Sequence, residues 1–194
     1  MTKLGAEDLQ FIEGSRSPYG SVLDVNGLEK KEWRILIKSL EKWVAIGGEP
    51  CKECGSTIKI RRGDCLPCGK QTNEFALSRL KFNHIYVAGS SKGEFLKIGS
   101  SKNFKKNVET LNKHGYGGVN DWQAIIAFEV TRADRVEFQI FQKIKKFFVP
   151  EHTRMGGREV TCLDIIKCKF SRAKKALIDS IHNQSLQIFL DNNL

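Results

Sequence analysis

Two polar residues interrupt a pair of apolar segments near the middle of the chain. Tyr86 lies in "HIYVA" and Lys97 in "FLKIG", each between aliphatic neighbours. Strand side chains alternate between two faces, so a turn near residues 90–93 would bring Tyr86 and Lys97 close together on one face. A lysine beside a tyrosine favours the phenolate, which can take a proton from water. The pair is a candidate general base, or else a polar decoration at a sheet edge.

A glutamate occupies a position that a buried helix face would normally fill with an apolar residue. In "ADRVEFQIFQKIKKFF" the apolar residues recur at helical spacing, and Glu137 lies in or beside their stripe. Burial of a carboxylate is unfavourable unless the group is paired or coordinated. Glu137 is therefore a candidate metal-ligating or acid/base carboxylate, with a boundary glutamate that captures a nearby lysine as the alternative.

Four cysteines have the spacing of a structural metal site. They form two CxxC pairs separated by ten residues, each pair followed by glycine: Cys51, Cys54, Cys65 and Cys68. Four thiolates can surround Zn²⁺ tetrahedrally, and a closed four-cysteine site leaves no position open for catalysis. The residues Lys59, Arg61 and Arg62 between the pairs are predicted to contact a phosphate backbone, or to form the solvated face of a small zinc module.

Charge and composition indicate a globular chain with a polyanionic partner. The 194 residues carry a formal charge of +10, of which residues 132–175 carry +7 while residues 1–46 are balanced. A basic surface attracts phosphate-bearing partners, so we expect a nucleic acid as partner, or else a merely solvated surface. We expect no membrane segment or signal peptide, and thus a cytoplasmic protein. In that compartment Cys162 and Cys168 are expected to be buried thiols.

The elements that must position these residues alternate between strands and helices. The pattern predicts an amphipathic helix over 27–48, a short helix over 72–82, and two strands joined by a tight turn from residue 83. A helix over 103–113, a strand over 122–130, a helix over 132–148, a short strand at "REVTCL" and a last basic helix over 171–191 follow.

These elements predict an α/β (α+β) fold with a small mixed, mainly antiparallel sheet flanked by helices, because the first two strands are too tightly joined to be parallel. We expect four regions: an arm and amphipathic helix at 1–48, a zinc-binding module at 49–72, a main domain at 83–165 and a basic helix at 166–194. Residues 1–27 are polar, and we expect a loosely packed lead-in there.

The order of the motifs in residues 83–165 resembles the GIY-YIG endonuclease superfamily. "HIYV" is followed by "KIG" with its lysine eleven residues after the tyrosine, then by "SSKNFKKN" at a helix start, and later by the glutamate-bearing helix. The resemblance is to the KIG-type branch found in phage and restriction proteins. It implies hydrolysis of DNA phosphodiesters by a water that Tyr86 helps to deprotonate, with Lys97 assisting and Glu137 holding one Mg²⁺ or Mn²⁺.

One position departs from that family pattern. Where the family usually has an arginine, eight residues after Gly99, this chain has Asn107. Loss of a positioned donor commonly slows a reaction about 10²- to 10³-fold. Lys105 or Lys106 could supply the charge, or Arg154 or Arg158 from the loop after the Glu137 helix.

The sequence thus predicts a metal-dependent endonuclease with a zinc ribbon, in a homing, restriction or host-DNA-degrading role, as a monomer or homodimer. Alternatives are a catalytically silent nucleic-acid-binding or regulatory protein, an inactivated variant at Asn107, and a zinc-ribbon adaptor. The resemblance implies double-stranded DNA as the partner, in a bacterial or phage-infected cell, and further predicted DNA contacts are Lys102, Lys105, Arg154 and Arg158. Three other residues have either a structural role or a place in the cleft: His84, His114 and Tyr116.

Overall fold

The computed structural model describes residues 10, 19–69, 84–155, 157–181 and 187–190. The predicted helix over 72–82 and most of the predicted N-terminal arm lie outside these residues.

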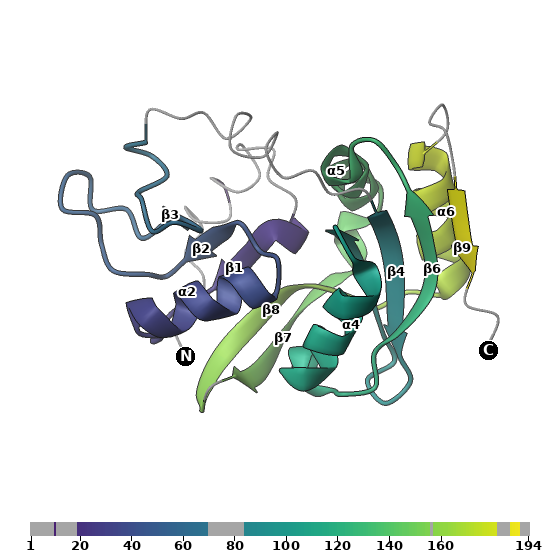
Figure 1. The fold of residues 1–194 in the computed structure, drawn as a ribbon, viewed down its shortest axis with the longest axis horizontal. Helices are drawn as coiled ribbons and strands as arrows, with labels where there is room; N and C mark the ends of the chain where they lie inside the picture. Colours follow the sequence, from purple (N-terminus) through teal and green to yellow (C-terminus); the bar gives the residue numbers. More distant parts are fainter. Residues whose placement is uncertain (1–9, 11–18, 70–83, 156, 182–186, 191–194) are drawn as a thin grey trace.

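A six-stranded antiparallel sheet forms the centre of the molecule (Figure 1). Its order is β7-β8-β5-β4-β6-β9, and every neighbouring pair is antiparallel. The predicted tight hairpin is present as β4 and β5. The strands are β4 (His84–Ser90), β5 (Phe95–Ser101), β6 (Gln123–Glu129), β7 (Phe148–Met155), β8 (Arg158–Ile166) and β9 (Gln187–Leu190).

Helices cover both faces of this sheet. Helices α5 (Ala133–Ile144) and α6 (Phe170–Ile181) pack on the face that carries Ile85 and Val87. Helix α4 (Phe104–Lys113) packs on the opposite face, together with the N-terminal residues. Two short 3-10 turns, η2 (Tyr116–Gly118) and η3 (Lys145–Phe147), join the elements. In the described part of the chain, no helix is long and apolar enough to cross a membrane.

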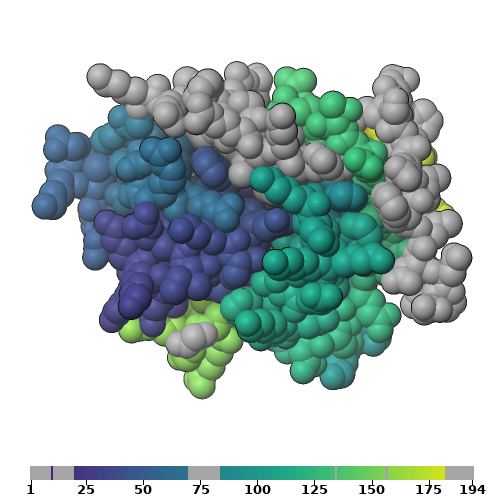
Figure 2. Space-filling view, viewed as in Figure 1, coloured from purple at the N-terminus to yellow at the C-terminus, as the bar shows by residue number. Residues whose placement is uncertain are grey.

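A second, three-stranded sheet belongs to an N-terminal unit, which we define as residues 19–69. It contains η1 (Tyr19–Ser21), β1 (Val22–Asp24), α2 (Lys30–Ser39), β2 (Val44–Ile46) and β3 (Lys59–Ile60), with β1 and β2 parallel. In the space-filling view this unit, coloured purple and blue, lies directly against the teal α4 region (Figure 2). Four α-helices in the described residues and a mainly antiparallel sheet confirm the predicted mixed α+β class.

Strand β1 lies where the sequence predicts a loosely packed lead-in. Its residues Val22 and Leu23 are buried, at 1% and 0% exposed. β1 bonds to β2 in the small sheet, and its contacts with β8 join that sheet to the large one. The apolar "SVLDV" is therefore part of the core, and the prediction for these residues is wrong.

Three predicted helices end earlier than the pattern suggests. Helix α2 stops at Ser39 because Glu41 adopts a left-handed conformation (φ 53°) and the Lys42 amide bonds back to Ile37 O at 2.9 Å. The following "VAI" then forms β2. Likewise the predicted 132–148 helix ends at Ile144 and "FVPEHTRM" forms β7, and residues 187–190 of the predicted last helix pair with β6 as β9. In each case strand pairing replaces a continuation of the helix.

Candidate functional site

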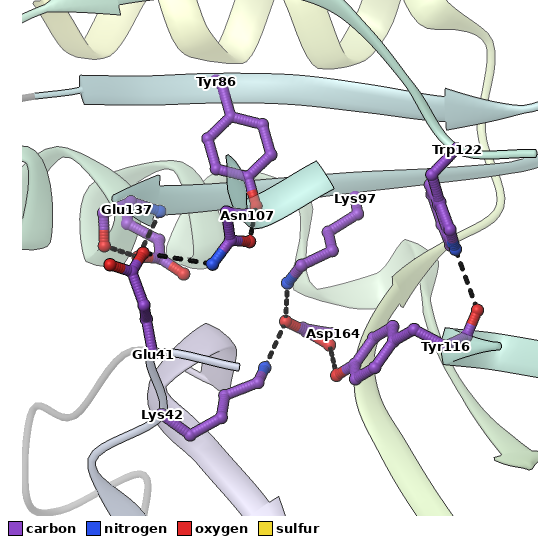
Figure 3. Close-up of polar contacts among 10 residues, drawn as sticks. Glu41, Lys42, Tyr86, Lys97, Asn107, Tyr116, Trp122, Glu137 and Asp164 are labelled. Atoms are coloured by element: carbon purple, nitrogen blue, oxygen red, sulfur yellow. Dashed lines mark hydrogen bonds and ion pairs between the residues drawn. The ribbon is translucent and has the colours of Figure 1, made fainter. Parts of the chain in front are cut away.

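The Tyr86 ring in β4 lies over Gly99 of the adjacent strand β5. Tyr86 in β4 faces Gly99 in β5, and Ala88 faces Lys97, so Tyr86 and Lys97 point to the same side of the sheet as predicted (Figure 3). A Cβ atom on Gly99 would come within 2.8 Å of the Tyr86 hydroxyl. The glycine of "KIG" is therefore required by the ring that lies over it.

Asn107 holds the Tyr86 hydroxyl. The phenol donates a hydrogen bond to Asn107 Oδ1 at 2.6 Å, and Asn107 Nδ2 donates to Glu41 Oε2 at 3.0 Å. Asn107 comes from the buried side of α4, and Glu41 from the turn between α2 and β2. The N-terminal unit thus reaches the tyrosine through one side-chain amide.

Lys97 turns to a carboxylate and not to the tyrosine. Asp164 in β8 accepts hydrogen bonds on the same oxygen from Lys97 and from Lys42 of the N-terminal unit, the latter at 2.7 Å. Its other oxygen accepts from the Tyr116 hydroxyl, and the Tyr116 carbonyl is held by Trp122 Nε1 at 2.8 Å. Figure 3 shows Asp164 at the centre of these contacts.

Electrostatics distinguish the groups of this cluster. Burial alone would raise the pKa of Asp164, but the two lysines lower it to about 2. Burial lowers the pKa of Lys42 even though Asp164 acts to raise it. The Asp164 carboxylate is therefore ionised at neutral pH, whereas burial disfavours the charged form of Lys42.

The tyrosine is not poised as a phenolate in this arrangement. Burial raises the pKa of Tyr86 well above its ordinary value of 10.0, and the nearby charges of Asp164, Glu137 and Glu41 raise it further. The expectation that Lys97 favours the phenolate does not hold here, because Asp164 neutralises the lysine and adds negative charge.

Glu137 is buried at the edge of the same cluster. Its Oε2 accepts hydrogen bonds from the Ser100 amide at 3.1 Å and from the Ser100 hydroxyl. Burial raises its pKa, while Lys97, Ser100 and Lys42 oppose that shift. A Cβ atom on Gly20 would fall 1.7 Å from Glu137 Oε1, so the backbone of η1 packs directly on the carboxylate.

The cluster is closed. Tyr86, Lys97 and Glu137 are 1%, 3% and 6% exposed, and Lys42 and Asp164 are 1% and 0% exposed. The covering groups come from the N-terminal unit, namely Gly20 on Glu137, Glu41 on Asn107 and Lys42 on Asp164. In this arrangement the N-terminal unit separates these groups from solvent.

The four cysteines predicted to bind zinc do converge. Their sulfur atoms lie within 4.8 Å of one another, with Cys51–Cys68 at 3.8 Å and Cys54–Cys65 at 3.5 Å. A tetrahedron with metal–sulfur bonds of about 2.3 Å has edges of about 3.8 Å, so the four sulfurs could hold a metal ion. Ile58, between the two cysteine pairs, and Leu66, within the second pair, are buried in one cluster with Val44 and Leu163, so the module is packed on the fold.

The basic residues predicted to contact DNA are spread over the molecule. Lys59 is buried, and Arg61 donates to Lys38 O at 3.3 Å, whereas Arg62 is exposed beside Asp64. Arg158 is held by Glu32 and the Gly27 carbonyl. The remaining predicted residues are exposed on α4, before it, or on β7, outside the buried cluster: Lys102, Lys105, Lys106 and Arg154.

The structure adds residues that the sequence alone did not identify as site residues. Asp164, Lys42, Glu41 and Ser100 all enter the cluster, and Tyr116 is central to it. A signal for Asp164 exists in "VTCLDII", where one aspartate interrupts an otherwise apolar strand. His84 lies beside the Phe104 ring and His114 beside Ser39, outside the hydrogen bonds of the cluster.

Comparisons of the chain with models of protein families, with curated proteins and with solved structures gave no match.

Proposed function

We propose that this protein is a metal-dependent DNA endonuclease of GIY-YIG type. The observation that carries the proposal is the meeting of Tyr86, Lys97 and Glu137 in one cluster, although they come from β4, β5 and α5. The charges of Lys97 and Glu137 are near enough to act on each other, and that of Glu137 acts on Tyr86. A buried cluster in which the pKa values of an acid and a tyrosine are shifted beside a lysine is typical of a catalytic site.

In this proposal Glu137 holds a divalent cation. A carboxylate is a hard oxygen donor, and Mg²⁺ is commonly bound by one or two carboxylates together with substrate phosphate and water. Among the described residues Glu137 lies in no group of three acidic, histidine or cysteine ligands, which fits an ion completed by substrate. The ion, when bound, would stabilise charge on the phosphoryl oxygens.

Tyr86 and Lys97 act on the water and the phosphate. Once the cover opens, solvent reaches the phenol, and the burial that raises its pKa is removed. Lys97 can then leave Asp164 for a phosphate oxygen, while the Tyr116 hydroxyl still donates to the aspartate. Asn107 orients the phenol in place of the arginine that the family resemblance implies.

The four cysteines are proposed to hold zinc as a structural ion. Thiolate sets of this spacing prefer zinc, and the closed set leaves no position for a reactant. Because Leu66 packs against Leu163, next to Asp164, the ion would support the N-terminal unit close to the cluster.

A second candidate is a DNA-binding protein on the same scaffold that does not cut. Asn107 favours this second candidate. Its Oδ1 accepts a hydrogen bond from the Tyr86 hydroxyl, but the neutral amide brings no positive charge to the site.

Incubation of supercoiled plasmid with Mg²⁺, Mn²⁺ or a chelator separates the two candidates. The endonuclease predicts metal-dependent nicking that falls at least about 100-fold in Glu137→Gln and Tyr86→Phe. Glu109→Gln, an exposed glutamate on α4, is the matched control and should cut like the wild type. Salt-sensitive binding without nicking in either metal would reject the endonuclease in favour of the silent binder.

A further inference from the structure

A basic groove lies on the side of the molecule opposite the cluster. It has a volume of about 880 Å³ and is formed by the end of α5, by η3, and by α6 with the two residues before it. These helices pack on the sheet face that carries Ile85 and Val87, whereas Tyr86 points to the other face. Five exposed cations line the groove, namely Lys143, Lys146, Lys169, Arg172 and Lys175.

The positive charge of this groove is largely unneutralised. Asp179 is the one acidic residue among the described residues that line it. Lys175 pairs with Asp179 at 3.4 Å, and that pair is exposed. Within the described part of the chain, the other four cations have no carboxylate as an ion-pair partner, which is the composition of a surface that binds a polyanion.

An aromatic ring holds two of these cations in place. The charged groups of Lys146 and Arg172 lie 5.2 and 4.8 Å from the centroid of the Phe147 ring. The ring thus serves as a support for cations and offers little free surface for stacking of an unpaired base. This arrangement suits the phosphates of a paired duplex better than the bases of a single strand.

The groove and the proposed catalytic glutamate share one helix. Lys143 follows Glu137 by six residues in α5, which corresponds to about 9 Å along the helix axis. The groove therefore lies at the C-terminal end of the same helix that carries the buried Glu137.

We infer that this groove binds the phosphate backbone of duplex DNA, without reading the base sequence. The choice of DNA as the polyanion rests on the proposed function, whereas the binding itself does not require cleavage. Contacts of this kind position a protein on the duplex and make affinity strongly dependent on salt.

The test measures binding of a short fluorescent DNA duplex over a range of salt concentrations, in a Glu137→Gln background that prevents cleavage. The groove variant combines Lys143→Gln, Lys146→Gln and Lys169→Gln, all at exposed positions. Removal of three phosphate contacts should lower the slope of log affinity against log salt by about 2 to 3. The matched control combines Lys30→Gln, Lys31→Gln and Lys38→Gln, three exposed lysines of α2, and should change the slope by less than about 1.

If the slope of log affinity against log salt fell equally in the two triple variants, the inference would be overturned, because overall charge and not the groove would then determine affinity. An unchanged salt slope of DNA binding in the groove variant would also overturn the inference. So would a groove variant that loses affinity for a polyglutamate peptide or for duplex RNA but binds duplex DNA like the wild type. Thermal unfolding of each variant verifies that it is folded. Groove-dependent binding in a wild-type protein that never nicks plasmid would reject the proposed nuclease and leave this inference standing.

Discussion

Asp164 and Glu137 are two buried carboxylates that respond to pH in opposite directions. The folded-state pKa of Asp164, about 2, lies below its ordinary 3.8, so its contribution to stability is complete above pH 3.8 and is lost as the pH falls toward 2. The folded-state pKa of Glu137 lies above its ordinary 4.5. Its ionised form is disfavoured by folding, so stability declines as the pH rises through and beyond 4.5.

At the residue scale, we predict that Glu137→Gln removes this decline and stabilises the protein at pH 7 relative to wild type. Asp164→Asn should instead destabilise it by about 3–5 kcal/mol, because two buried lysines lose their common carboxylate. Urea unfolding at several pH values between about 3 and 8 measures both effects, with Glu109→Gln as the exposed control. If the stability of Glu137→Gln followed the wild-type pH profile, ionisation of Glu137 would not be the cause of the decline with rising pH.

At the scale of single elements, the turn between α2 and β2 carries the contacts that close the cluster. Glu41 has the left-handed conformation that usually favours glycine at a helix end, and its side chain holds Asn107. The neighbouring Lys42 reaches Asp164. Glu41 thus occupies a strained backbone position, and its side chain contributes a contact to the candidate site that glycine would lack.

We therefore predict that Glu41→Gly is more stable than Glu41→Ala by about 1 kcal/mol. Both variants lose the bond to Asn107, but only glycine relieves the left-handed strain. The same pair of substitutions at Glu109, inside α4, is the control and should rank in the reverse order by about 1 kcal/mol. Chemical denaturation gives the stabilities of the four variants. A Glu41→Ala variant more stable than Glu41→Gly would show that the turn is unstrained.

At the scale of the whole molecule, the N-terminal unit and the large sheet share one hydrophobic core. Leu23, Trp33 and Ile37 of the unit belong to the same buried cluster as Tyr86 and Ile165 of the sheet. The cysteine module joins this assembly through Ile58 and Leu66, which pack in a cluster with Leu163 of β8. The cover of the candidate site is therefore part of the fold and not a separate domain resting on it.

We predict a single cooperative unfolding transition whose midpoint depends on the metal at the four cysteines. Removal of the metal with a chelator, or Cys54→Ser, should lower the midpoint by about 5–10 °C, which corresponds to roughly 2–3 kcal/mol for a chain of this size. Cys168→Ser, outside the metal site, should leave it nearly unchanged. Calorimetry with measurement of bound metal tests this, and a separate low-temperature transition for the cysteine module would refute the shared core.

Much of the candidate site was predictable from local patterns. The alternation in "HIYVA" and "FLKIG" determined which side chains share a face, and the helical stripe around Glu137 determined that it is buried. The spacing of the CxxC pairs likewise predicted that the four sulfurs meet. These features depend on periodicity and short loops, which adjacent residues specify by themselves.

Only the tertiary structure decided which partners these side chains have. Asp164 and Lys97 are 67 residues apart, and Lys42 and Asp164 are 122 apart, so no local pattern connects them. Their pairing directs Lys97 away from Tyr86 and makes the N-terminal unit a cover for the cluster. The amino-acid sequence by itself determined the groups that are available for chemistry, because side-chain type and strand or helix periodicity are local properties. Long-range packing decided their charge state and their access to solvent, because burial and ion pairing arise only when distant segments meet.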